Sequence, residues 1–211
     1  MKRIFISDLH LDTNRMDLTR AFTKFLSEHC QNIDELYILG DFFELWLGDD
    51  DQSPLNNEVV NALSVLTCDV FIMHGNRDFL FASVFANKTG VTLISDPSTL
   101  DRGLVLSHGD ALCTDDIAYQ QMRKVLRGDA WQTEILSKSL AERQVFGKGL
   151  RAESIANNAN KSSAIMDVNA AAVADLIGIN VTTFIHGHTH RPGIHPIEQR
   201  SAQRIVLGDW G

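Results

Sequence analysis

The sequence predicts an α/β fold, because short apolar runs alternate along the chain with segments of helical periodicity. The apolar runs are rich in Ile, Val, Leu and Phe and too short for helices, which is typical of buried strands. Strands that alternate with helices favour a domain built around a largely central sheet. The predicted strands are residues 3–7, 35–39, 69–73, 91–94, 104–107, 183–185 and 204–207.

Amphipathic periodicity predicts helices between several of these strands. Apolar side chains recur every three to four residues over residues 17–29 and again over residues 57–66. A third such segment, residues 167–177, is rich in alanine. There Asp167 is the expected N-cap and Gly178 the expected C-terminal stop.

Residues 115–163 break this alternation. They contain no strand-like run and no proline, and helix-forming residues dominate. Gly128 interrupts the segment, as do Gly147 and Gly149. The sequence therefore predicts an inserted helical cap of two or three helices.

The whole chain, residues 1–211, has the length of a single domain. Its 44% hydrophobic and 22% charged residues are ordinary for a folded protein. A formal net charge of −8 argues against a general nucleic-acid binder, which usually has a basic surface. We therefore expect no nucleic-acid partner, and no obligate protein partner is evident from the sequence.

Both the N-terminus and the cysteines indicate the cytoplasm. The apolar run after Met1 is too short for a signal peptide, and no window approaches the ~20 apolar residues of a membrane-spanning helix. Cys30, Cys68 and Cys113 show no close pairing, which is typical of reduced thiols. The chain stops at Gly211, after an apolar strand expected to need a partner on each side. Either it ends naturally there or a C-terminal segment is missing.

Short polar motifs follow most of the predicted strands. Because ligands bind at the carboxyl ends of strands in α/β sheets, we expect these motifs to converge on one site. Any one of them also suits an ordinary polar turn, whereas the ordered set indicates a ligand site. The motifs are Asp8-Leu9-His10, Gly40-Asp41-Phe42-Phe43-Glu44, His74-Gly75-Asn76-Arg77-Asp78, His108-Gly109-Asp110 and His186-Gly187-His188-Thr189-His190.

Carboxylate, amide and imidazole groups in these motifs are ligands that Mn, Fe, Zn and Mg ions accept. Two such ions about 3.5–4 Å apart can clamp an in-line displacement at phosphorus and lower the pKa of a shared water, giving a bridging hydroxide nucleophile. Asp41 is the natural bridge because a carboxylate has two oxygens to share. Asn76 is a neutral ligand that keeps the cluster positive. We expect the remaining histidines to be structural or exposed: His29, His74, His186 and His195.

The order of the motifs resembles that of the calcineurin-like metallophosphoesterases: Asp-x-His, Gly-Asp, Gly-Asn-His, a lone His and Gly-His-x-His. This resemblance covers essentially the whole chain and implies a β-sandwich core flanked by helices. It also implies two divalent metal ions, with Mn²⁺ the most consistent choice. The implied ligands are Asp8, His10 and His190 for the first ion, Asn76, His108 and His188 for the second, and Asp41 for both.

Arg77 stands where most members of that superfamily carry histidine. With it, the motifs Gly-Asp-Phe-Phe-Glu, Gly-Asn-Arg-Asp-Phe-Leu and His-Gly-His-Thr-His-Arg-Pro resemble the UDP-2,3-diacylglucosamine pyrophosphatase family of lipid A biosynthesis. That resemblance implies hydrolysis of UDP-2,3-diacylglucosamine to UMP and 2,3-diacylglucosamine 1-phosphate, by a chain that usually continues past Trp210. It implies catalytic roles for His10, Asp41, Asn76 and Arg77, and substrate contacts by Asn76, Arg77, Asp116, Tyr119, Arg151, Ser154, Asn158, Lys161 and His188.

The chemistry of a pyrophosphate accounts for an arginine at this position. A phosphodiester releases an alkoxide, which a histidine acid helps to protonate. A pyrophosphate releases a phosphate monoester with a relevant pKa of about 6, so stabilising charge matters more than protonation. The planar guanidinium suits phosphate, so Arg77 favours anhydride over ester cleavage. The alternative is that Arg77 only pairs with Asp78 or another carboxylate.

The predicted cap combines basic and apolar side chains within an acidic protein. Apolar residues would receive acyl chains at ~0.8 kcal/mol per buried methylene, and basic residues would hold phosphate. The simpler alternative is that the apolar set packs within the cap and the bases are solvated. The mixture would also let the cap rest on an anionic membrane surface, where each base contributes roughly 1 kcal/mol. We expect a cytoplasmic protein that is peripheral on the inner membrane. The bases are Arg123, Lys124, Arg127, Lys138, Arg143, Lys148, Arg151 and Lys161.

Two other functions compete with this one. The same metal site could serve another phosphodiesterase or a nucleotide pyrophosphatase, although small nucleotides need no large apolar groove. The fold could also be a non-catalytic binding module, although loss of function usually removes ligands and here all of them are present.

Overall fold

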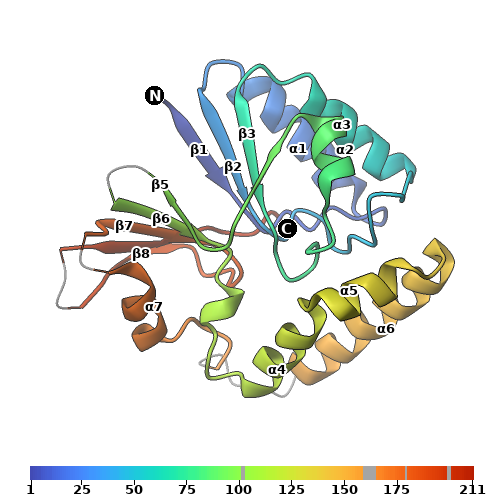
Figure 1. The fold of residues 1–211 in the computed structure, drawn as a ribbon. Helices are drawn as coiled ribbons and strands as arrows, with labels where there is room; N and C mark the ends of the chain where they lie inside the picture. Colours follow the sequence, from blue (N-terminus) through green and yellow to red (C-terminus); the bar gives the residue numbers. More distant parts are fainter. Residues whose placement is uncertain (101–102, 159–164, 179, 199–200) are drawn as a thin grey trace.

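The computed structural model describes residues 1–100, 103–158, 165–178, 180–198 and 201–211. Two β-sheets lie face to face, with helices on their outer faces and a further layer of helices to one side (Figure 1). The β-sandwich flanked by helices, with a helical cap, is therefore confirmed. The expectation of a largely central sheet is wrong, because the strands divide between two sheets. Apolar runs indicate that strands are buried, but they do not show which sheet each strand joins.

The first sheet contains the N-terminal strands in chain order, all parallel: β1 (Arg3–Ile6), β2 (Glu35–Leu39), β3 (Asp69–Met73) and β4 (Thr92–Ile94). Ile38 of β2 is level with Ile6 of β1 and Ile72 of β3. These strands therefore end at one edge of the sheet. The loops that follow them leave the sheet side by side.

The second sheet has the order β5-β6-β7-β9-β8. Its three central strands, β6 (Leu104–Ser107), β7 (Thr183–His186) and β9 (Gln203–Val206), are parallel. The edge strands, β5 (Ser98–Leu100) and β8 (Gly193–Pro196), pair antiparallel with their neighbours. The apolar strand β9 thus has a partner on each side, as expected, although its second partner β8 was not predicted.

Alternating side chains of β2 explain why the two sheets pack together. Tyr37 and Leu39 face the second sheet, where they cluster with Leu106 of β6 and Ile185 of β7. The intervening residues Leu36 and Ile38 belong instead to the large core beneath the helices. Both faces of this sheet are therefore buried, which accounts for its continuous apolar runs.

Helices cover the outer face of each sheet (Figure 1). The first sheet is covered by α1 (Met16–His29), α2 (Pro54–Ser64) and α3 (Ser83–Thr89). The second is covered by α7 (Ala170–Ile177), whose Val173 and Ile177 pack on Phe184. Phe22 of α1 is fully buried, and such a side chain contributes about 1.5–3 kcal/mol.

Three helices form the cap: α4 (Ile117–Leu126), α5 (Asp129–Leu136) and α6 (Leu140–Asn158). They lie beside the loops that follow the strands of the first sheet (Figure 1). Gly128 is the N-cap of α5 and separates it from α4, as predicted. Gly147 and Gly149 lie inside α6, so the predicted interruption there is wrong, because packing overrides the weak helix propensity of glycine. The predicted end of the cap, residues 159–163, lies outside the described residues.

Two helices begin at other residues than predicted. Asn169, not Asp167, caps α7, because its side chain accepts hydrogen bonds from the N–H groups of Ala171 and Ala172 at 2.9 and 3.2 Å. Asp167 binds Arg191 instead, at 2.8 Å. Helix α2 begins one turn early.

A sequence signal for that early start exists, since Ser53 caps α2 and Pro54 occupies its first turn. No such signal marks α3, β5 and β8, which were missed. They are short, and the two edge strands carry polar residues in place of an apolar run.

The cysteines are free thiols, with Cys30 and Cys113 buried and Cys68 half-buried, as expected. Among the residues described above, no helix is both long and apolar enough to cross a membrane.

Candidate metal centre

All seven predicted metal ligands lie together where the two sheets meet. The first sheet supplies four of them, on the loops after β1, β2 and β3, and the second supplies three, after β6 and β7. Parallel strands in register explain this convergence, because their carboxyl ends share one edge. In chain order the seven are Asp8, His10, Asp41, Asn76, His108, His188 and His190.

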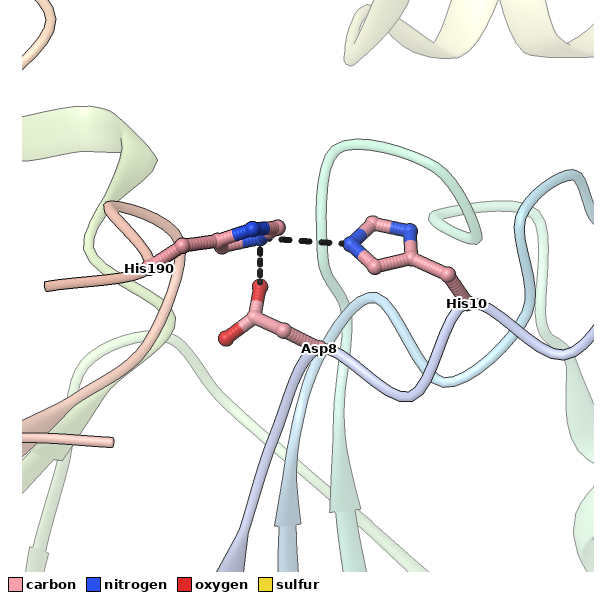
Figure 2. A group of neighbouring side chains, drawn as sticks. All are labelled: Asp8, His10 and His190. Atoms are coloured by element: carbon pink, nitrogen blue, oxygen red, sulfur yellow. Dashed lines mark hydrogen bonds and ion pairs between the residues drawn. The ribbon is translucent and has the colours of Figure 1, made fainter. Parts of the chain in front are cut away.

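One group consists of Asp8, His10 and His190 (Figure 2). The Nε2 atoms of the two imidazoles are 3.3 Å apart, and His190 Nε2 lies 3.3 Å from Asp8 Oδ1. Figure 2 shows these side chains reaching toward one another from N-terminal and C-terminal loops. Asp8 also accepts hydrogen bonds from the backbone N–H of His188, at 2.9 and 3.1 Å.

A second group consists of Asp41, His108 and His188, with Asn76 beside it. His108 Nε2 is 3.0 Å from Asn76 Oδ1, and the rings of His108 and His188 are 5.0 Å apart. His108 Nδ1 donates to the carbonyl of Leu39 at 2.9 Å. That bond keeps a proton on Nδ1, so Nε2 is the ring nitrogen that faces the site.

The Asp41 carboxylate lies between the two groups. Its Oδ2 is 3.8 Å from Nε2 of His10, and its Oδ1 is 3.6 Å from Nε2 of His108. The backbone N–H of Arg77 donates to the same Oδ1 at 2.8 Å, which holds the carboxylate in place. One oxygen thus faces each group, which is the geometry that a bridging ligand needs.

A left-handed backbone conformation at several ligand residues directs their side chains toward the centre. Within the described residues, the non-glycine positions with positive φ all belong to the seven predicted ligands. Aspartate and histidine tolerate this conformation better than most residues, and such strain gathers at functional sites. The φ angles are 55° for Asp8, 49° for His10, 48° for Asp41, 66° for His188 and 52° for His190.

Two glycines allow the loops to approach this closely. A Cβ on Gly75 would lie 2.2 Å from Asp41 Oδ1, and one on Gly187 would lie 2.3 Å from Asp8 Oδ2. A side chain at position 75 would push the loop after β3 away from the loop after β2, and one at position 187 would push the two sheets apart.

Electrostatics at the centre favour a bound cation. Burial by itself lowers the pKa of His108, but the carboxylates of Asp41, Asp110 and Asp8 outweigh it and raise that pKa to about 9. Burial raises the pKa of Asp8, but His190 and His108 lower it to about 2. The centre therefore concentrates buried negative charge beside imidazole and amide donors. This donor set fits divalent metal ions.

Asp78 is not a ligand, but it holds two of the ligand-carrying loops together. The sequence did not suggest this role. The fully buried carboxylate of Asp78 accepts hydrogen bonds from the backbone N–H groups of Gly75 at 2.8 Å and Phe42 at 2.6 Å. It thereby ties the loop carrying Asn76 to the loop carrying Asp41. Burial and the nearby Asp41 raise the pKa of Asp78 to about 7.

A cavity of about 1170 Å³ opens over the two groups. A smaller, largely apolar cavity of about 100 Å³ adjoins it beneath the cap, lined in part by Phe79, Trp131 and Phe146. The predicted substrate residues Asn76, Arg77, Asp116, Tyr119, Arg151, Ser154 and His188 line the larger cavity. Asn158 is the last residue of α6, and Lys161 lies outside the described residues.

Arg77 lines the larger cavity, and one of its side-chain N–H groups can still donate a hydrogen bond to a ligand. Its buried Nε has no hydrogen-bond partner among the described residues. Among the described residues Asp78 binds backbone N–H groups and makes no ion pair with Arg77, so pairing with Asp78 gains no support. The other carboxylate that Arg77 influences is Glu44, whose pKa the charge of Arg77 helps to lower. A buried unpartnered donor is costly unless an anion satisfies it.

Several bases of the cap hold the cap to the core. Arg123 binds the buried Asp110 at 2.7 Å, and Arg127 donates to the carbonyl of Gly75 at 2.9 Å. Tyr119 also donates to Asp110, at 2.6 Å. Both arginines are therefore paired within the protein, although 23% and 20% of their side chains stay exposed. Sequence could not show these contacts because their partners are distant in the chain.

Two of the remaining histidines are structural, as expected. His186 is fully buried and its ring contacts Arg204 at 3.2 Å, and His74 lies 3.0 Å from the carbonyl of Phe81. His29 and His195 are exposed.

Comparison with known proteins agrees with this geometry. Residues 1–192 match the calcineurin-like phosphoesterase family, whose members are metal-dependent. The chain is 45% identical to the UDP-2,3-diacylglucosamine hydrolase of Marinobacter nauticus, 46% to that of Hahella chejuensis and 45% to that of Cellvibrio japonicus. These alignments cover 100% of this chain and 90%, 90% and 91% of the relatives. The chain therefore belongs to the calcineurin-like phosphoesterases and, within them, to the family of UDP-2,3-diacylglucosamine hydrolases.

Proposed function

We propose that the chain hydrolyses the pyrophosphate bond of UDP-2,3-diacylglucosamine, releasing UMP and 2,3-diacylglucosamine 1-phosphate. The observation that carries this is Asp41, whose two oxygens face two ligand groups on the floor of a large cavity. Relatives named for this hydrolysis, similar along the whole chain, support the substrate.

The proposed centre holds two divalent ions, most consistent with Mn²⁺. Imidazole, carboxylate and amide ligands suit that ion, although they also accept Fe, Zn or Co. When bound, the two ions would supply an activated water and offset charge on the phosphoryl oxygens. The proposed ligands are Asp8, His10 and His190 for one ion, Asn76, His108 and His188 for the other, and Asp41 for both.

Arg77 is proposed to stabilise the phosphate that leaves. The backbone N–H of Arg77 is fixed by Asp41, so the side chain starts from a defined point beside the centre. Its unpartnered Nε can donate to a phosphoryl oxygen. A guanidinium spreads its charge over several donors, which suits the phosphate monoester released from an anhydride.

The cap is proposed to bind the acylated sugar. Tyr119 and Ser154 line the large cavity at the side of the cap, next to the smaller apolar cavity. Trp131 and Phe146 in that smaller cavity offer apolar surface to an acyl chain, at ~0.8 kcal/mol per methylene. Asp116 and Arg151 add polar contacts toward the sugar phosphate.

The cap is also proposed to rest on the anionic inner membrane. Ile117, Val125 and Val145 are 66%, 60% and 75% exposed, and Lys124 and Lys148 are exposed near them. Exposed apolar and basic side chains together suit an anionic bilayer surface. We expect co-sedimentation with anionic vesicles at low salt and release at high salt. Protein that stays in the supernatant at low salt contradicts this.

Product analysis with purified protein tests the hydrolysis. With Mn²⁺ we expect UMP and 2,3-diacylglucosamine 1-phosphate from UDP-2,3-diacylglucosamine, and much slower release from the deacylated sugar nucleotide. Asp41→Asn should lower the rate at least about 100-fold. Equal rates on both substrates would favour a general nucleotide pyrophosphatase. Folded protein without any hydrolysis would favour a binding module.

A further inference from the structure

Glu44 lies where the metal centre meets the cap. It follows β2 by a few residues, and its backbone N–H donates to the carbonyl of Leu11 at 3.1 Å, which fixes its position. One carboxylate oxygen, Oε2, lies 3.0 Å from Nδ1 of His10. The other, Oε1, pairs with Nε of Arg151 in the cap.

The first of these contacts orients a proposed metal ligand. Nδ1 of His10 makes no aligned hydrogen bond, but the negative charge of a carboxylate 3.0 Å away favours the proton on that nitrogen, so Nε2 faces the centre. Nε2 is the atom that lies 3.3 Å from His190 and 3.8 Å from Asp41. Glu44 therefore influences which way the imidazole of His10 faces the centre.

The second contact belongs to a stripe along α6. Arg143, Gly147 and Arg151 are spaced four residues apart, so they share one face of the helix. Arg143 pairs with Asp50, and Gly147 packs against the side chain of Leu45. All three contacts dock α6 on the loop after β2. Only the contact of Arg151 involves Glu44, the carboxylate that also lies against His10.

We propose that Glu44 is a positioning residue that links docking of the cap to cation binding at Asp8, His10 and His190. This inference rests on the proposed function, which makes His10 a metal ligand. Coupling of this kind is reciprocal. A docked Arg151 holds Glu44 against His10 and strengthens binding of the ion, and the bound ion holds α6 down in return.

Mn²⁺ titration of the full chain, by calorimetry and by electron paramagnetic resonance, tests the link. We expect wild-type protein to bind two ions, and Glu44→Gln to weaken one of them about 10–100-fold while sparing the other. Arg151→Gln should weaken the same ion by about 5-fold or more, which is the lower end of typical coupling. Arg151 is partly exposed, so this variant serves if Glu44→Gln does not fold.

Asp50→Asn is the matched control. It also neutralises a carboxylate paired with an arginine of the α6 stripe, but that carboxylate is 61% exposed and pairs with Arg143, two turns away from Arg151. We expect both Mn²⁺ affinities to stay within about 2-fold of wild type. Amide hydrogen exchange over residues 140–158 should slow on adding Mn²⁺ in wild type and in Asp50→Asn, and not in Glu44→Gln.

Three results are decisive. Unchanged affinities in both Glu44→Gln and Arg151→Gln overturn the link, while the proposed function stands. An equal loss in Asp50→Asn also overturns it, because any loosening of the cap would then suffice. Wild-type protein that binds no Mn²⁺ overturns the proposed function, and the link with it.

Discussion

Individual residues of the metal centre carry strain that the surrounding fold holds in place. A left-handed non-glycine residue costs on the order of 1–3 kcal/mol, and Asp8 and His10 are both in that conformation. Backbone hydrogen bonds from Asp8 to Gly40 and from His10 to Asp41, at 3.1 and 3.0 Å, maintain it. The ligand side chains are therefore arranged before any cation binds.

Arg77 gives the sharpest prediction for a single residue. Arg77→His should lower the rate of pyrophosphate hydrolysis about 100-fold, because it removes a preorganised donor from the leaving phosphate. The measurement is kcat for UMP release. Hydrolysis of bis(p-nitrophenyl) phosphate should fall less, since histidine can serve an ester as an acid. An unchanged kcat on the pyrophosphate would rule out the role of Arg77.

The sequence predicts which ligand residues meet, because the signal for each of them lies in the residues next to it in the chain. Each follows an apolar strand within a few residues, and parallel strands end at a common edge. Glu44 and Asp110 stand in the same motifs but received no role. Their partners, Arg151 and Arg123, lie in the cap, and no local pattern shows which carboxylate a distant arginine will meet.

Helix α6 packs closely against the loop after β2 at one of its two glycines. A Cβ on Gly147 would lie 2.7 Å from a side-chain atom of Leu45, whereas one on Gly149 would have nothing within 4 Å. Both glycines therefore lie inside the helix, but Gly147 packs against another side chain and Gly149 faces open space.

Alanine substitutions exploit that difference. Gly149→Ala should stabilise the protein by about 0.5–1 kcal/mol, because alanine favours the helix. Gly147→Ala should be less stable than Gly149→Ala by about 1–3 kcal/mol, because the added methyl forces Leu45 aside. Urea unfolding measures both free energies. Equal stability of the two variants would show that α6 does not pack on Leu45 in solution.

The sequence predicts long elements with a clear apolar periodicity better than short ones. The helices α1 and α7 and the central strands showed clear apolar patterns and were found. The edge strands β5 and β8 have one exposed side and few apolar residues, so their pairing partners define them and their own sequence does not.

Across the whole molecule, the centre joins the two sheets. Asp8, His10 and Asp41 come from the first sheet, whereas His108 and His190 come from the second. Bound ions would therefore stabilise the interface between the sheets as well as take part in catalysis. The family resemblance implied a β-sandwich, but neither it nor the apolar runs showed which strands belong to which sheet.

Removing metal should therefore lower thermal stability. An ion present at 100 times its Kd stabilises the folded state by about 2.7 kcal/mol, which corresponds to roughly 5–10 °C in Tm for a chain of this size. Calorimetry with Mn²⁺ and with EDTA measures the difference, which should shrink in Asp41→Asn. Identical Tm values under both conditions in wild type would show that the ions do not join the sheets.

The distribution of ligands along the chain also has a consequence during synthesis. Asp8, His10, Asp41 and Asn76 leave the ribosome early, but His188 and His190 follow β7 near the end. Until then the nascent chain exposes carboxylates with few imidazole partners. We expect high-affinity uptake of metal only after nearly the whole polypeptide has emerged, so truncated translation products would not sequester divalent ions.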